Sequence, residues 1–185
     1  MTGSLTGNAP IAKLPGIVLL KNLRKYLDML KIDIEHLRQK DLTDVLAIEE
    51  EAHDHPWSAG DFNKHAMHLS TRQFTATVDG EIVGYIAINT DRERVRAIEN
   101  IAVRKDMRRK GIATHLVKET CDFFPEEFDI VQAMVNETND VAIGFFSKGI
   151  GCRAVLVKEP YEEIDRDGYL FSRFWNGDRE LVEAN

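Results

Sequence analysis

The sequence predicts an α+β domain with a mixed sheet, and three observations lead to this fold class. Short runs rich in β-branched residues alternate with longer stretches whose apolar residues have helical spacing. Asp79-Gly80 separates two strand-like runs, as a two-residue hairpin turn does. The run "DIVQAMV" at 129–135 is largely apolar, which is typical of a strand buried on both faces. The sheet is therefore expected to combine an antiparallel hairpin with a parallel pair of strands.

Capping residues help to place the helices. Ser58 can cap one helix, Asp41 or Thr43 can cap the helix before it, and Thr138 or Asn139 can cap the last one. In chain order, the expected elements are strand 32–38, helix 41–52, helix 59–67, hairpin 73–91, strand 96–104, helix 111–124, strand 129–135, helix 140–148, strand 152–159 and strand 168–175.

Composition and charge narrow the function classes. The chain has 185 residues, 43% of them hydrophobic and 30% charged, which fits one globular domain with an extension. The net charge of −7 argues against nucleic-acid binding, which needs a strongly basic face. Cys121 and Cys152 do not make a disulfide framework and are expected to be reduced core residues. No run approaches the ~18 apolar residues of a membrane span, so we expect a cytoplasmic protein with no membrane partner.

The chain is expected to consist of an extension, a domain and a tail, at residues 1–31, 32–176 and 177–185. Within the extension, four leucines have helical spacing and are flanked by basic residues, namely Leu20, Leu23, Leu27 and Leu30. This pattern predicts an amphipathic helix that docks on the domain or on a partner subunit. An organelle-targeting peptide is the first alternative, because no acidic residue precedes Asp28, and contact with a membrane surface is the second.

A cluster of cations follows the strand at 96–104, namely Arg104, Lys105, Arg108, Arg109 and Lys110. Cations just before a helix oppose the helix dipole and cost stability unless an anion binds there. The first N–H groups of a helix form such an anion site, and Gly111 and Ala113 leave room for a phosphate to approach them. The sequence therefore predicts a phosphate-bearing ligand. The alternative is an exposed basic turn in which Gly111 serves only the backbone conformation.

The motif Arg108-x-x-Gly111-x-Ala113 resembles the pyrophosphate-binding motif of the GNAT (GCN5-related) N-acetyltransferases, Arg/Gln-x-x-Gly-x-Gly/Ala. "NIAV" stands before the motif, "NETNDVAIGFFSKGIGC" follows at the expected distance, and the similarity covers about residues 32–174. Within the family the chain looks most like the RimI-type enzymes, which acetylate protein N-termini; "IEEEAHDHPWS" is a further cue. The resemblance implies a mixed, mostly antiparallel central sheet, with helices on both faces and splayed parallel strands at the acetyl-CoA site.

The resemblance also implies acetyl-CoA as the acetyl donor. It assigns the pantetheine arm and the acetyl carbonyl to the backbone of Ile101, Ala102 and Val103. It assigns the pyrophosphate to Arg108, Arg109, Lys110, Gly111, Ile112, Ala113 and Thr114. Asn139 and Phe146 are assigned to the pantetheine or thiol region. The assignment of Asn139 agrees with the expected strands, because parallel neighbours must splay to admit a ligand and Asn139 follows the second of them.

The sequence departs from the RimI-like pattern at two catalytic positions. Aligned on Asn139, the position of the basic Glu is Met134 and the position of the acidic Tyr is Phe146. Neither side chain can exchange a proton. Because a thiol leaves with a pKa of about 8.5, a missing acid would slow the enzyme without silencing it.

Two other residues are candidates for these roles. Glu99 is the candidate base, acting directly or through a water, and is expected to share a strand face with Ala97, Ile101 and Val103. The alternative for Glu99 is an exposed carboxylate paired with Arg96 or Arg92. Tyr161 is the candidate proton donor or amine-positioning group, and the alternative is an ordinary surface tyrosine.

The region 53–68 contains four histidines but no cysteine or second carboxylate cluster that would complete a metal site, so we expect no metal. The region is acidic through Glu49, Glu50, Glu51, Asp54 and Asp61. We interpret these residues as a solvated face; the alternative is attraction of a cationic acceptor, either a peptide N-terminus or a polyamine. Trp57 is either a platform for the acceptor or a buried anchor.

The expected function is transfer of an acetyl group from acetyl-CoA to a primary amine, and the expected acceptor is the α-amine of a protein or peptide. A small-molecule amine acetyltransferase of the same fold is one alternative. A degenerate domain that binds acyl-CoA as a sensor or interaction module is another, favoured by Met134 and Phe146. The protein is expected to be a monomer or a homodimer.

Overall fold

The computed structural model describes residues 31–92, 94–122, 130–158 and 167–174. The chain divides into two units, Met1–Lys31 and Ile32–Asn185, and the fold described below is that of the second. The predictions for the extension, for the tail and for Tyr161 concern residues outside the described part of the chain.

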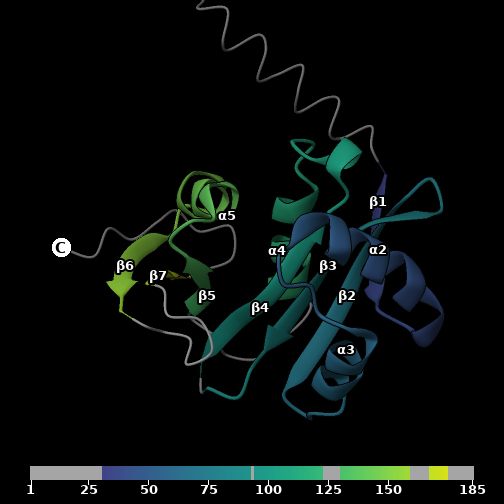
Figure 1. Cartoon of the computed structure of the whole chain (residues 1–185), viewed down its shortest axis with the longest axis horizontal. Coiled ribbons are helices and arrows are strands. Elements are labelled where there is room, and N and C mark those ends of the chain that lie inside the picture. Colours follow the sequence, from purple (N-terminus) through teal and green to yellow (C-terminus); the bar gives the residue numbers. More distant parts are fainter. Residues whose placement is uncertain (1–30, 93, 123–129, 159–166, 175–185) are drawn as a thin grey trace, which may run out of the picture. The chain divides into compact units, whose positions relative to one another are not determined.

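Seven strands form one sheet in the described residues, in the spatial order β1-β2-β3-β4-β5-β7-β6 (Figure 1). The strands are β1 (Ile32–His36), β2 (Thr71–Val78), β3 (Glu81–Asn89), β4 (Val95–Val103), β5 (Ile130–Asn136), β6 (Arg153–Val157) and β7 (Gly168–Phe174). Only β4 and β5 pair in parallel, and the other neighbours are antiparallel. The predicted mixed, mostly antiparallel sheet is confirmed.

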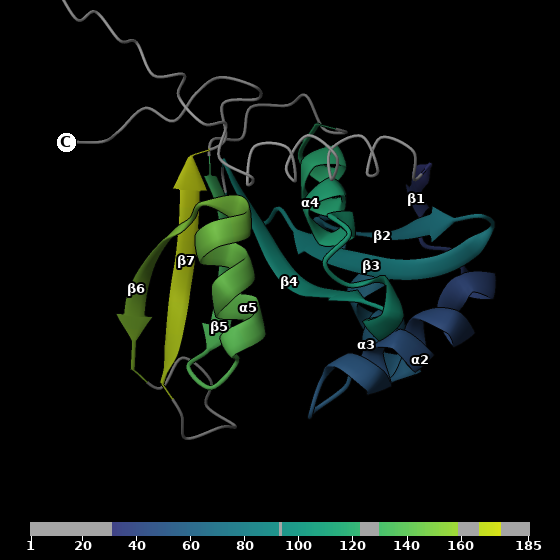
Figure 2. The same ribbon diagram turned by 90° about the horizontal axis from the view of Figure 1, so that it is seen from above.

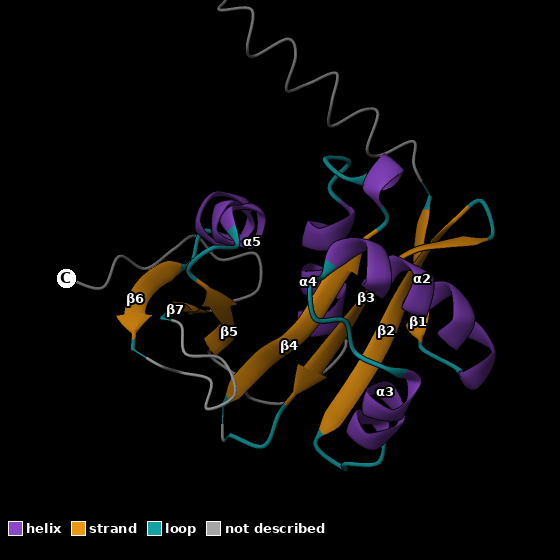
Figure 3. Ribbon diagram, in the orientation of Figure 1, coloured by secondary structure: helices purple, strands orange, loops and turns teal. Residues whose placement is uncertain are grey.

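Helices cover both faces of this sheet, as predicted (Figures 2 and 3). They are α2 (Leu42–Ala52), α3 (Ala59–Ala66), α4 (Ile112–Asp122) and α5 (Asp140–Gly144), which continues as a π-helical turn over Phe145–Ile150. Short 3₁₀ turns at Gln39–Asp41 and Lys105–Met107 precede α2 and α4. In Figure 2, α4 lies on one side of β2–β4, whereas α2 and α3 lie on the other side.

Alternate residues of β3 fill the two layers of the core. Tyr85 packs edge-on against Phe62 of α3, in a cluster that includes Val45 of α2. The next residue, Ile86, faces the opposite side and lines a small enclosed space with Val117 of α4. Because side chains alternate across a strand, this one strand supports both layers.

The backbone has the predicted hairpin turn and the predicted cap at Ser58, whereas Asp41 has a different role. Asp79 and Gly80 both have positive φ angles, 51° and 84°, as the two central residues of a type I′ hairpin turn require. Ser58 caps α3 through a reciprocal capping box with Asp61. Asp41 precedes α2 without capping it, because its carboxylate accepts instead from the Arg38 backbone N–H at 2.9 Å.

A β-bulge in β4 changes which side chains face each layer. Across the β3–β4 ladder, Ala87 pairs with Asn100 and Ile88 with Ile98, so Glu99 is an extra residue. Ile98 lies toward α4, whereas Asn100 lies toward α2 and bonds to Glu49. Two residues that simple alternation would place on one face therefore lie on opposite faces.

The bulge overturns the prediction that Glu99 shares a face with Ile101 and Val103. Ile101 pairs with Ile86, which faces α4. Val103 pairs with Gly84, and a Cβ on Gly84 would contact both Val103 and Leu116 of α4. Glu99 instead reaches toward α3, on the opposite face of the sheet.

Candidate active site

The parallel strands β4 and β5 separate where the bulge begins. They pair from Val95 with Ile130 to Ile98 with Ala133, and no β5 residue pairs with β4 beyond this point among the described residues. Figure 2 shows the two strands starting side by side and then diverging. The open edge of β4 after the separation consists of Glu99–Val103, which includes the predicted contacts Ile101, Ala102 and Val103. Backbone groups on this edge are available to a ligand that lies between the strands.

The turn that leads from β4 into α4 has two residues in the left-handed region. Arg109 has φ 65° and Gly111 has φ 79°. A non-glycine residue at such an angle costs of order 1–3 kcal/mol and is found most often at functional sites. The first helical bond of this helix runs from His115 N to Gly111 O, so the N–H groups of Ile112, Ala113 and Thr114 precede the helical ladder.

The cationic side chains of this turn make different contacts. Arg104 is held by Glu81 at 3.0 Å and by Asp106 at 2.8 Å, so it stabilises the turn. Arg108 donates its Nε to the carbonyl of Val103 at 2.9 Å and thereby ties the turn to the end of β4. Arg109 is exposed and forms no ion pair with any described residue. The left-handed bend thus presents an exposed arginine beside a helix N-terminus, a combination that is able to bind an anion.

Asn139 and Phe146 differ in what they offer to a ligand. Asn139 is exposed and caps α5 by accepting from Ala142 N at 3.0 Å, which leaves its amide nitrogen for a ligand. The side chain of Phe146 is 3% exposed and stacks on Phe171 of β7. It packs α5 onto the sheet, and its role as a cofactor contact stays a prediction.

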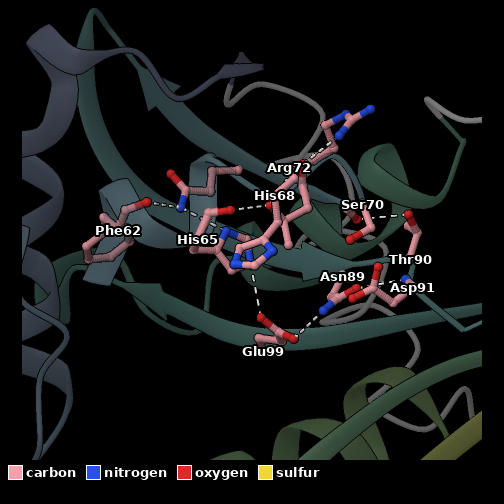
Figure 4. A network of polar contacts seen from close by, with 11 residues as sticks. Phe62, His65, His68, Ser70, Arg72, Asn89, Thr90, Asp91 and Glu99 are labelled. Atoms are coloured by element: carbon pink, nitrogen blue, oxygen red, sulfur yellow. Dashed lines mark hydrogen bonds and ion pairs between the residues drawn. The ribbon is translucent and has the colours of Figure 1, made fainter. Parts of the chain in front are cut away.

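Glu99 stands at the point where the strands separate, in a polar network shown in Figure 4. One carboxylate oxygen accepts from Asn89 Nδ2 at 2.8 Å, and the other lies 3.1 Å from Nε2 of His65. Hydrogen bonding to His65 and Asn89 holds the pKa of Glu99 below its ordinary value, although partial burial opposes this. The carboxylate is partly exposed, and its partners are neither Arg96 nor Arg92, as the alternative had supposed.

Residues on β5 next to Glu99 are apolar or neutral. Ala97 pairs with Gln132, and Met134 follows on the same face of β5. Because Ala133 and Phe171 face α5, the side chains of Gln132 and Met134 face the side of the sheet where Glu99 lies. Glu99 is thus the carboxylate that the described part of the sheet brings to this position.

Glu49 was expected on a solvated acidic face, and this prediction is wrong. Its side chain is buried, with one oxygen accepting from Trp57 N at 2.7 Å and from Asn100 Nδ2 at 3.0 Å. Its other oxygen accepts from the hydroxyl of Tyr85. The spacing of Val45, Ile48 and Glu49 puts all three on one face of α2, and this signal was available in the sequence.

Two further members of the acidic region have structural partners. Asp61 belongs to the cap of α3, and Glu51 accepts from Lys105 N at 2.9 Å. Trp57 is partly buried and packs against Phe62 and His65, with ring centroids 5.3 and 5.4 Å apart. Glu50 and Asp54 are left as exposed carboxylates near the loop between α2 and α3.

Metal binding needs several ligands grouped together, and crossing a membrane needs a long apolar helix. The described residues contain no group of three or more His, Cys, Asp or Glu side chains arranged to hold a metal ion. None of the helices described is both long and apolar enough to cross a membrane. Cys121 and Cys152 are both buried and form no disulfide, and burial raises the pKa of the Cys152 thiol to about 11.

Comparison with known proteins identifies the family of this chain. An N-alpha-acetyltransferase of Sulfurisphaera tokodaii is 26% identical over 152 residues, which are 75% of this chain and 90% of that protein. The fold resembles Ard1 from Thermoplasma volcanium (TM-score 0.67, 22% identity, 77% of this chain and 97% of that one). It also resembles the Escherichia coli ribosomal-protein-S18-alanine N-acetyltransferase (TM-score 0.66, 20% identity, 83% and 99%). The model of the acetyltransferase (GNAT) family matches residues 33–152, and the chain therefore belongs to this family of acyltransferases.

Proposed function

We propose that this protein is an acetyl-CoA-dependent N-acetyltransferase whose acceptor is the α-amine at the N-terminus of a protein or peptide. The observation that carries the proposal is the combination of an open β4 edge, an anion site at one end of it and Glu99 at the other. The relatives support the acceptor class, because one is an N-alpha-acetyltransferase and another is a ribosomal-protein-S18-alanine N-acetyltransferase.

The donor would lie between the diverging strands. Arg109, Lys110 and the first N–H groups of α4 would bind its diphosphate, with Gly111 leaving their approach open. The backbone edge of Ile101–Val103 would bind the pantetheine arm, which carries amides of its own. This places the acetyl group beside the bulge, near Glu99.

In the transfer, Glu99 accepts, directly or through a water, the proton that the amine loses as its nitrogen forms the new C–N bond. Backbone N–H groups on the open edge of β4 stabilise the negative charge that develops on the carbonyl oxygen. The C–S bond then breaks, and the sulfur takes its proton from solvent or from an acid. A free α-amine has a pKa of about 7.7–8.0, so it needs only modest help from a base. Tyr161 stays the predicted acid.

The acceptor would approach from the side of α2 and α3, the side that Glu99 faces. Glu50 and Asp54 are exposed there and would attract a cationic N-terminus, an effect that weakens with salt. Trp57 fixes the loop between α2 and α3 through its partly buried ring, which packs against Phe62 and His65.

Thiol release from acetyl-CoA, measured with a panel of peptides and a panel of small amines, tests the proposal. Turnover with peptides supports it, and turnover with small amines alone would assign the protein to that second class. Met134, where a RimI-like enzyme has its base, is the observation that favours the second class. Binding of coenzyme A without turnover on either panel would indicate a sensor and contradict an enzymatic role.

A further inference from the structure

His65 of α3 is a buried histidine that the mechanism above does not use. Its ring lies under Trp57 of the acceptor-side loop, at a centroid distance of 5.4 Å. Its two nitrogens face two different side chains, Gln73 of β2 and Glu99 of β4 (Figure 4). The ring therefore connects the loop between α2 and α3 with the bulge where the strands separate.

The neighbours of His65 determine which nitrogen carries the proton. Nε2 of Gln73 donates to the carbonyl of Phe62 at 2.9 Å, and because a carbonyl can only accept, this fixes the orientation of the Gln73 amide. The same Nε2 lies 2.9 Å from Nδ1 of His65, so its second proton points at Nδ1. Nδ1 must then accept, and the proton of the neutral ring resides on Nε2.

Nε2 of His65 lies 3.1 Å from one carboxylate oxygen of Glu99, so this tautomer puts the ring proton on the nitrogen that is nearest to that carboxylate. The other oxygen of Glu99 is held by Asn89, whose own side-chain oxygen accepts from Asp91 N at 2.8 Å. Asp91 is a charged group close to Glu99, and its negative charge raises the pKa of this carboxyl.

We propose that His65, locked by Gln73 as the Nε2–H tautomer, is a positioning residue that holds the Glu99 carboxylate toward the reacting amine. The inference rests on the proposed function, because it concerns the base of that reaction. With both oxygens tethered, by α3 and by β3, the carboxylate is fixed before the acceptor arrives. Such preorganisation matters because a displacement of 1 Å can cost about a hundredfold in rate.

Two substitutions separate the two nitrogens of the ring. His65→Gln places an amide nitrogen near the position of Nε2, so it preserves a donor to Glu99. His65→Asn reaches only as far as Nδ1, so it preserves the contact with Gln73 and loses the donor to Glu99. The matched control is His68→Asn, which changes an exposed histidine three residues further on. Thermal melts of all three variants establish that each remains folded.

For His65→Asn we expect kcat to fall about tenfold, while the KM for acetyl-CoA stays close to that of the wild type. For His65→Gln we expect a kcat within about threefold of the wild type. In His65→Asn the pKa of Glu99, followed by ¹³C NMR of its carboxyl carbon, rises because a group that lowered it is gone. Equal kcat values for His65→Asn and His68→Asn would overturn the inference while leaving acetyl transfer intact.

A measurement on the wild-type protein does not depend on activity. The ¹⁵N shifts of the His65 imidazole should show that the proton of the neutral ring resides on Nε2. A neutral ring with its proton on Nδ1 would contradict the inference. Absence of acetyl transfer to both panels would instead defeat the proposed function, and the NMR result would still show whether His65 donates to Glu99.

Discussion

Removing the buried carboxylate of Glu49 should destabilise the fold far more than neutralising it. In Glu49→Ala, the N–H of Trp57 and the amide of Asn100 lose their acceptor. Each polar group left unsatisfied in the interior costs about 1–3 kcal/mol, and the missing side chain leaves a cavity. We expect the free energy of unfolding to fall by about 3–5 kcal/mol.

Glu49→Gln should lower the free energy of unfolding only slightly, because the hydrogen-bond donors and acceptors around this side chain can be matched again. The hydroxyl of Tyr85 has a single proton, and it lies between an oxygen of Glu49 and Oδ1 of Asn100, the latter at 3.0 Å. In the variant this hydroxyl can donate to Asn100 and accept from the new amide. The oxygen that the substituted side chain retains keeps both of its donors, so Trp57, Asn100 and Tyr85 all keep their hydrogen bonds. We expect a loss of no more than about 1 kcal/mol.

Denaturant unfolding of the two variants and of Glu50→Ala checks this prediction. Glu50 is the exposed neighbour, and its removal should change stability by no more than about 0.5 kcal/mol. Equal losses for Glu49→Ala and Glu49→Gln would refute the reasoning, because they would show that charge, and not hydrogen bonding, governs this site. A loss below about 1 kcal/mol for Glu49→Ala would show that the network contributes little.

Three further predictions concern the donor site, the base and a helix cap. Gly111→Glu should abolish binding of coenzyme A in calorimetry, because it adds a carboxylate at the anion site, whereas Lys118→Glu, an exposed charge change on the same helix, should bind normally. Glu99→Gln should lower kcat by about tenfold or more with little change in affinity for coenzyme A; wild-type rates would remove it from the mechanism. Ser58→Ala should cost about 1 kcal/mol and lower Tm by several degrees. Hydrogen bonding to Ser58 also lowers the pKa of Asp61. The stability that this cap contributes is therefore present at neutral pH and should be lost as pH falls through that lowered pKa. An effect of Ser58→Ala that does not depend on pH would argue against the capping box.

Features that depend on local chemistry could be predicted from the sequence. The turn at Asp79-Gly80, the cap at Ser58 and the start of α4 beside Gly111 each rest on neighbouring residues, and the structure has all three. The divergence of the parallel strands followed from the family resemblance and is present in the structure.

Features that depend on tertiary contacts could not be predicted. The alternation of β4 breaks at Glu99 because of a bulge, and a bulge requires knowledge of the strand opposite. The spacing of Glu49 with Val45 and Ile48 indicated that it lies on the buried face of α2, but its partners on β3 and β4 are distant in sequence and could not be predicted. The role of His65 likewise depends on Gln73 and Glu99, and in the sequence it was only one histidine among four.

The extra residue in β4 also means that this strand can lose one position without exchanging its two faces. If Glu99 were deleted, Ile98 and Asn100 would become neighbours, and regular alternation would keep them on the opposite faces that they already occupy. Asn100 would still meet the carboxylate of Glu49, and Ile101 would still lie on the side of α4. A deletion at this position should therefore remove the carboxylate at the point where the strands separate and leave both core layers in register.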